Sequence, residues 1–307
     1  MPPSHGAPVN KTVSVIGVSM DLGASRSGAR LGPEMLRMAG LISRIKALGL
    51  QVRECADIVV APEDSVDGGP GRPKHVQAIV NASSAIADAV EAALRTDTFP
   101  VVVGGDHSMA AGVMAGIARV LGPQGIIWID AHADLNTPDS SPTGNLHGMS
   151  MAAALGEMQD IFAPGVFPSP AADAKRCVFI GLRELDPAEK RRIHDLGIAC
   201  FTMSDIDRIG MGRALEKAIA IAGHGPGSVH VSYDIDSLDP SLAPGTGTPV
   251  RGGLTYREAH LAMEMIAKSG VAHSLELAEV NPLLDTHNKT ARLAAELICS
   301  LLGKAII

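Results

Sequence analysis

Short apolar runs alternate with helix-length amphipathic segments along most of the chain, and this alternation limits the possible folds more than any other feature. The apolar runs are rich in β-branched residues, which favour strands. Clear runs lie at residues 13–18, 101–103, 126–129, 178–182, 229–235 and 275–280, with weaker ones near Val52 and Ala199. Helical segments lie at residues 33–48, 75–94, 109–121, 187–196, 213–222, 256–268 and 288–302. The alternation predicts an α/β fold in which helices sandwich a mostly parallel sheet of up to eight strands.

Length and composition suit one large folded unit. The chain has 307 residues, of which 46% are hydrophobic and 19% are charged, and its composition does not divide into unlike halves. We therefore expect a single catalytic domain over residues 1–307, with residues 1–10 as a flexible N-terminal tail.

Charge and patterning exclude several classes of partner. The formal net charge is -7 and no cluster of Lys and Arg stands out, so nucleic acid is not expected as a partner. There is neither a signal-peptide pattern nor an apolar run long enough to span a bilayer, so we expect no membrane association and a cytoplasmic location. The four cysteines, Cys55, Cys177, Cys200 and Cys299, are widely scattered and read as reduced thiols without a function.

Potential ligands follow the apolar run at 126–129. In a parallel sheet, ligands bind outside the carboxyl ends of the strands, so polar residues just after a run mark the expected site. Asp130, His132 and Asp134 recur every second residue, and an extended backbone points such residues the same way. Two aspartates brought together repel each other unless a cation lies between them. We therefore favour a metal site over helix-capping aspartates at a strand end.

Two further runs end in the same kind of residue. Asp234 and Asp236 follow one strand, and His107 follows another after two glycines. Alone, the His107 pattern is more typical of a satisfied histidine at the start of a helix than of a metal ligand. Four carboxylates and two imidazoles could hold two divalent ions. Oxygen and nitrogen donors without thiolate suit Mn²⁺, with Fe²⁺, Co²⁺ or Zn²⁺ as alternatives. Two metals about 3.5 Å apart can activate a shared water, so hydrolysis is the expected reaction.

Together these motifs resemble the three metal signatures of the ureohydrolase family and, within it, the arginases. The matching segments are Gly-Gly-Asp-His-Ser at 104–108, Asp-Ala-His-Ala-Asp at 130–134 and Ser-Tyr-Asp-Ile-Asp-Ser-Leu-Asp-Pro at 232–240. The resemblance implies a three-layer α/β/α fold around an eight-stranded parallel sheet, with two Mn²⁺ ions bridged by hydroxide. By the resemblance, one ion takes His107, Asp130, Asp134 and Asp234, and the other takes His132, Asp130, Asp234 and Asp236.

The loop after residue 135 carries the resemblance to arginases in particular. By that resemblance, the α-carboxylate of L-arginine is gripped by Asn136, Thr143 and Asn145. His147 would be a proton shuttle, and it forms the expected catalytic set with Glu279 and Asp134. Composition alone would describe the same loop as a turn-forming segment rich in Ser, Thr and Pro.

Two carboxylates and a threonine complete the expected substrate site. The resemblance assigns Asp186 to the α-ammonium group and Glu279 to the guanidinium group. Asp186, which precedes a proline, also fits the N-cap of a helix. Thr248 would contact the reacting end of the substrate, or its segment would simply form a Gly/Thr turn. Glu184 replaces an aspartate of the relatives, which leaves its role open, and Glu276 is expected to be a free surface glutamate.

The resemblance therefore implies hydrolysis of L-arginine to L-ornithine and urea. One alternative is an agmatinase or another guanidino-acid amidinohydrolase, whose substrate would differ at the end away from the guanidinium group. The other is a non-enzymatic protein that binds arginine or metal. A nucleotide-binding protein is disfavoured because no Gly-x-Gly-x-x-Gly motif follows the first strand. Tyr256-Arg257-Glu258 resembles a segment near arginase subunit contacts, which implies a homotrimer or homohexamer.

Overall fold

The computed structural model describes residues 12–60, 72–163, 166–225 and 227–305, so the predicted tail at residues 1–10 lies outside the described residues. The described chain forms one parallel sheet with the order β2-β1-β4-β9-β8-β5-β6-β7, and β3 also pairs with β1. The strands are β1 (Thr12–Ser19), β2 (Gln51–Glu54), β3 (Ile58–Val59), β4 (Phe99–Gly104), β5 (Gln124–Ile129), β6 (Ala172–Leu182), β7 (Ala199–Thr202), β8 (Val229–Asp234) and β9 (Ala272–Ala278). The predicted parallel sheet is confirmed, and β3 adds a short ninth strand.

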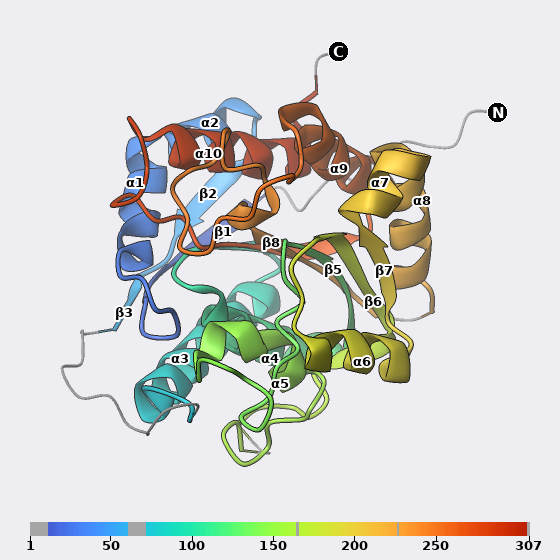
Figure 1. The fold of residues 1–307 in the computed structure, drawn as a ribbon. Helices are drawn as coiled ribbons and strands as arrows, with labels where there is room; N and C mark the ends of the chain where they lie inside the picture. The colour runs from blue at the N-terminus through green and yellow to red at the C-terminus, as the bar shows by residue number, and fades with distance from the viewer. Residues whose placement is uncertain (1–11, 61–71, 164–165, 226, 306–307) are drawn as a thin grey trace.

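Helices cover both faces of the sheet and complete a three-layer α/β/α fold, as predicted (Figure 1). One layer contains α1 (Gly32–Met38), α2 (Leu41–Ala47), α7 (Met203–Ile209), α8 (Met211–Ala222), α9 (Tyr256–Ser269) and α10 (Lys289–Leu301). The other contains α3 (Val76–Arg95), α4 (Ala110–Leu121), α5 (Ser150–Ala154) and α6 (Pro187–Leu196). Over the residues described, no helix is both long enough and apolar enough to cross a bilayer.

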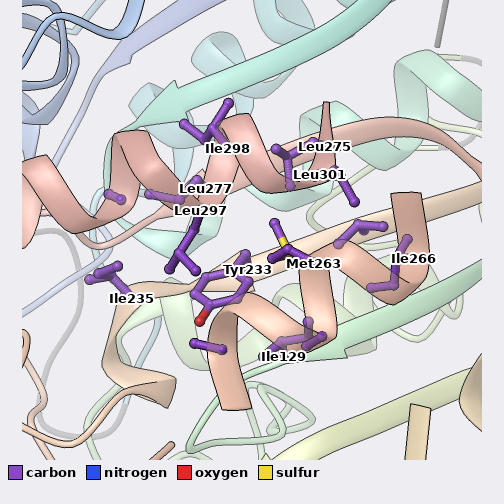
Figure 2. Packing of buried hydrophobic residues seen from close by; sticks show 14 of the residues in the cluster. Ile129, Tyr233, Ile235, Met263, Ile266, Leu275, Leu277, Leu297, Ile298 and Leu301 are labelled. Atoms are coloured by element: carbon purple, nitrogen blue, oxygen red, sulfur yellow. The ribbon is translucent and has the colours of Figure 1, made fainter. Parts of the chain in front are cut away.

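The largest core cluster lies between the sheet and the layer that contains α9 and α10. Tyr233 of β8 and Leu277 of β9 pack there with Met263 of α9 and Leu297 of α10 (Figure 2). Each such buried side chain contributes about 1.5–3 kcal/mol to the free energy of folding. Because side chains alternate along a strand, the neighbouring residues of β8 and β9 point to the opposite face of the sheet.

One predicted helix is interrupted. The segment at 33–48 forms α1 and α2, separated by Gly40 in a left-handed conformation with a φ of 84°. A residue with a side chain adopts this conformation at a cost, so the glycine permits the break that the amphipathic pattern did not predict. The short helices α5 and α7 were not predicted either, whereas α6 begins at Pro187 with Asp186 as its N-cap, as expected.

Candidate metal centre and substrate cavity

The candidate site lies at the carboxyl ends of four neighbouring strands, β4, β9, β8 and β5. At the end of β4 the chain turns through Gly104, whose φ is 117°. A Cβ atom on Gly104 would lie 2.2 Å from Cγ of Pro33, so only glycine fits this turn. The turn carries His107 over the edge of the sheet, where it begins a short 3₁₀ helix.

His107 is buried, and one of its ring nitrogens faces three carboxylates. Nδ1 lies 3.2 Å from Asp130 Oδ2 and 3.1 Å from Oδ2 of both Asp134 and Asp234. Burial alone would lower the pKa of His107, but the three carboxylates raise it well above its usual value. Nδ1 nevertheless has no hydrogen-bond partner with good geometry among the described residues. The nitrogen is therefore placed as a ligand for a cation would be.

His132 faces a second group of carboxylates. Its Nδ1 lies 3.1 Å from Asp236 Oδ2 and 3.4 Å from Asp130 Oδ1. Asp130 is fully buried, which would raise its pKa, but His107 and His132 lower it below the usual value. Burial raises the pKa of Asp234 well above its usual value, and the charges of Asp236 and Asp130 add to that shift. The cluster therefore contains more acidic groups than its two imidazoles balance.

Among the described residues, ligand atoms within 4.8 Å of one another form two groups of three. The first group is His107, Asp130 and Asp234, and the second is Asp130, His132 and Asp236. Asp130 belongs to both groups. Asp134 belongs to neither, although its Oδ2 faces His107. The structure thus brings together all six residues that the sequence singles out as metal ligands.

Two acidic residues of the site adopt left-handed backbone conformations. Asp134 has a φ of 49° and Glu279 a φ of 64°. This conformation costs a residue other than glycine about 1 kcal/mol or more, and such strain concentrates at functional sites. Glycine would relieve the strain at either position, so the strain is consistent with a need for the carboxylates themselves.

Glu279 and His147 form a hydrogen-bonded pair beside the cluster. Glu279 Oε1 lies 2.9 Å from His147 Nδ1 and accepts a hydrogen bond of 2.8 Å from the backbone N–H of His107. Burial would lower the pKa of His147, but the bond to Glu279 and the charge of that carboxylate raise it to about 9. The contact therefore favours the protonated form of His147 beside the Glu279 carboxylate.

A cavity of about 180 Å³ opens beside these groups. Its lining includes five residues predicted to bind the substrate and four of the expected catalytic or metal-binding residues. The first set is Asn136, Thr143, Asn145, Asp186 and Thr248, and the second is His132, Asp134, His147 and Asp234. Glu279 is 1% exposed and is hydrogen-bonded to His147, which lines the cavity. Residues that the sequence predicted for the substrate and the metal therefore line one continuous cavity.

Glu189 also lines the cavity, and sequence reasoning did not single it out. It accepts hydrogen bonds from the backbone N–H groups of Asp186, at 2.9 Å, and Leu135, at 3.1 Å. Burial raises its pKa to about 7. Asp186 itself accepts a bond of 2.8 Å from Asn136 Nδ2. The Asp-Pro-Ala-Glu pattern of a capping box, at 186–189, was the signal that could have identified Glu189.

The expectation that Glu276 is a free surface glutamate is wrong. Glu276 is 0% exposed and lies within β9, one row below the candidate site. Its burial could not be predicted from the sequence, because a single glutamate between two leucines is also the pattern of a strand with one solvent-facing side. Here helices cover both faces of β9, so each residue of its central part is buried.

Comparisons with known proteins identify relatives that cover nearly the whole chain. The arginase family model matches residues 11–303. The arginase of Bacillus caldovelox is 44% identical over 298 residues, which cover 97% of this chain and 100% of the relative. Its solved structure has a TM-score of 0.91 and covers 96% of this chain and 99% of its own. A hypothetical agmatinase from Burkholderia thailandensis is 27% identical, with a TM-score of 0.74 over 97% of this chain and 85% of its own.

Proposed function

The chain belongs to the arginase family, and from that premise we propose that it hydrolyses L-arginine to L-ornithine and urea at the carboxyl edge of its sheet. The observation that carries the proposal is the shared cavity. His132 and Asp134 of the acidic cluster line it together with Asn136 and Asn145 of the following loop. A bound arginine can therefore present its guanidinium group to the cluster and its α-amino acid group to the loop.

The donor set fits divalent metal ions. It combines buried carboxylates with two imidazoles, it contains no thiolate, and His107 Nδ1 is left without a good hydrogen bond. These features favour two Mn²⁺ ions, with Co²⁺, Fe²⁺ or Zn²⁺ as alternatives. We assign one ion to His107, Asp130, Asp134 and Asp234, and the other to His132, Asp130, Asp234 and Asp236. Bound divalent ions lower the pKa of a water toward about 7 and so supply hydroxide as the nucleophile.

Glu279 is assigned to the guanidinium group. Its Oε1 accepts two hydrogen bonds, from His107 N and His147 Nδ1, which fix the carboxylate. Among the described residues both hydrogen bonds of this carboxylate go to Oε1, which leaves Oε2 to accept from a substrate N–H. A charge-assisted bond there orients the guanidinium carbon toward the acidic cluster, and such orientation supplies much of the catalysis in reactions of this kind. Thr248, whose Oγ1 donates to Asp236 Oδ2 at 3.0 Å, stands at the same end of the cavity.

His147 is assigned to proton transfer. Its Nδ1 is engaged by Glu279, and its ring lines the cavity, so Nε2 is the nitrogen that can exchange a proton with the leaving amine or with solvent. The bond to Glu279 stabilises the protonated ring, and a protonated imidazole can act as the general acid for departure of ornithine.

The remaining polar groups of the cavity are assigned to the α-amino acid end of arginine. Asn136, Thr143 and Asn145 offer donors to the carboxylate, and Asp186 offers an acceptor to the ammonium group. The bond from Asn136 Nδ2 to Asp186 links the two halves of this subsite. Agmatine lacks the carboxylate, so these contacts favour arginine.

A comparison of substrates tests the proposal. Urea release is measured from L-arginine, agmatine and 4-guanidinobutyrate with the wild type and with Asn136→Ala. We expect arginine to be preferred, and we expect Asn136→Ala to lower kcat/KM for arginine by about tenfold while changing agmatine turnover little. A preference for agmatine would instead identify an agmatinase. Tight binding of arginine and metal without urea release would identify a non-enzymatic binding protein.

Assembly and location complete the proposal. We assign a homotrimer or homohexamer, supported by the position of Tyr256, which is 44% exposed at the start of α9 in the segment that resembles arginase subunit contacts. Light scattering coupled to gel filtration measures the subunit number. We assign the cytoplasm as the location, in keeping with four cysteines that are all free thiols.

A further inference from the structure

The pairing of β8 with β9 places four polar side chains beneath the candidate metal centre. Ser232 is in register with Glu276, and His230 is in register with Ser274. All four are at most 1% exposed. They point away from the core cluster that contains Tyr233, because side chains alternate along each strand. The sheet therefore has a buried polar patch directly below the acidic cluster.

The carboxylate of Glu276 is the least expected member of this patch. It is 0% exposed, and neither of its oxygens has a hydrogen-bond partner among the described residues. Two imidazoles lie near Oε1: His230 Nε2 at 3.4 Å and His107 Nε2 at 3.7 Å. A buried carboxylate without any partner is strongly destabilising, so its interaction with these rings has to offset the loss of hydration.

His107 is held on both sides of its ring. Nδ1 faces the acidic cluster, whereas Nε2 lies 2.8 Å from Ser232 Oγ and close to Glu276. The ring stacks on Trp128 with a centroid distance of 4.3 Å and an interplanar angle of 14°. When an imidazole binds a metal through one nitrogen, a carboxylate near the other N–H fixes the tautomer and makes the ligating nitrogen more basic.

We propose that Glu276 is a positioning residue that holds His107 with Nδ1 toward the acidic cluster and strengthens its binding of a divalent metal ion. His230 Nε2 also faces Oε1 of Glu276, and the His230 ring is held by a contact of 2.9 Å between its Nδ1 and Ser274 Oγ. This inference rests on the proposed metal-dependent function and adds to it a residue that does not touch metal or substrate.

The test measures metal binding as well as activity. Glu276→Gln keeps the size of the side chain and removes its charge. Titration of the metal-free protein with Mn²⁺ in a calorimeter is expected to give a dissociation constant about 10–100-fold weaker than that of the wild type. The visible spectrum of the Co²⁺-loaded protein is expected to change as well. Ser14→Ala is the control, since it removes a buried hydroxyl of β1 that bonds to Thr98. Its metal affinity should stay within about twofold of the wild type.

Two outcomes are decisive. Unchanged metal affinity and an unchanged Co²⁺ spectrum in Glu276→Gln would overturn the inference alone, whereas a wild type that binds no divalent metal would overturn the proposed function with it. If Glu276→Gln does not fold, Glu276→Asp is tested in its place, because the shorter side chain moves the carboxylate away from His107. The expected weakening is then about 3–10-fold, and an unchanged affinity would again overturn the inference.

Discussion

Nδ1 of His147 lies 2.9 Å from Oε1 of Glu279, although the two residues are 132 positions apart in the sequence. The first comes from the loop after β5 and the second from the end of β9, so the contact exists only because the two strands end at the same edge of the sheet. The same carboxylate oxygen accepts the backbone N–H of His107. The proposed roles in substrate orientation, proton transfer and metal binding therefore meet at one carboxylate.

The first prediction concerns Glu279. Glu279→Gln keeps an oxygen that can accept from His107 N but removes the charge that would pair with a guanidinium group. We expect kcat/KM for arginine to fall by about 100-fold, the usual size for loss of one member of a buried charge pair. Steady-state urea assays measure this, and a Mn²⁺ titration checks that metal affinity is retained. A fall of less than about threefold would remove Glu279 from the guanidinium subsite.

A second prediction follows from the pKa of about 9 for His147 in the metal-free protein. This folded-state pKa lies above the unfolded value of about 6.5. The stabilisation of the fold by the ion pair with Glu279 is therefore fully present below about pH 6.5. The stabilisation is lost as the pH rises through about 9. His147→Asn should therefore lower the free energy of unfolding most at pH 6 and least at pH 9.5, in urea titrations with a chelator present. A difference that does not vary with pH would show that the pair is not ionised.

A third prediction concerns Lys74, the cation that bonds to the proposed carboxylate subsite. Its Nζ donates to Asn145 Oδ1 at 3.1 Å, and its backbone N–H donates to Gly144 O. No lysine or arginine is among the described residues that line the cavity. Lys74 would therefore act on the carboxylate through Asn145, which does line the cavity. Lys74→Met should raise KM for arginine by about tenfold, with little change in kcat.

The control for this variant is Lys46→Met, which removes an exposed lysine on α2. Agmatine supplies a second comparison, because it has no carboxylate for Asn145 and Lys74 to attract. The ratio of kcat/KM for arginine to that for agmatine should fall only in Lys74→Met. An unchanged ratio would mean that Lys74 merely supports the loop.

Arg183 supports a fourth prediction, on stability. Its guanidinium group donates to the backbone carbonyls of Asp236, Ser237, Leu238 and Val250, at distances of 2.7–3.3 Å. Arg183→Met should lower the free energy of unfolding by about 2–4 kcal/mol, since bonds from charged donors are stronger than average. Arg183→Lys should lose nearly as much free energy of unfolding as Arg183→Met, because one ammonium group cannot reach all of these carbonyls. Chemical denaturation measures both, and a loss below about 0.5 kcal/mol in Arg183→Met would contradict this role.

Most of the strands and helices could be predicted from the sequence, and so could the position of the candidate ligands at one edge of the sheet, but features that depend on packing could not. Asp130, His132 and Asp134 could be predicted because a strand has a period of two and because parallel strands bind ligands at their carboxyl ends. The order of the strands could not be predicted, since an apolar run does not indicate which other strands it pairs with. Glu276 was misassigned for the same reason, because burial on both faces of β9 depends on helices elsewhere in the chain.

The most direct test of the account is a titration of the metal-free protein with Mn²⁺ in the presence of L-arginine, with urea and ornithine measured together. We predict no urea without metal, a rise in rate that reaches its plateau at about two equivalents per chain, and equal amounts of the two products. Arginine that remains intact at metal saturation would contradict the central claim, and so would an undiminished rate in excess chelator.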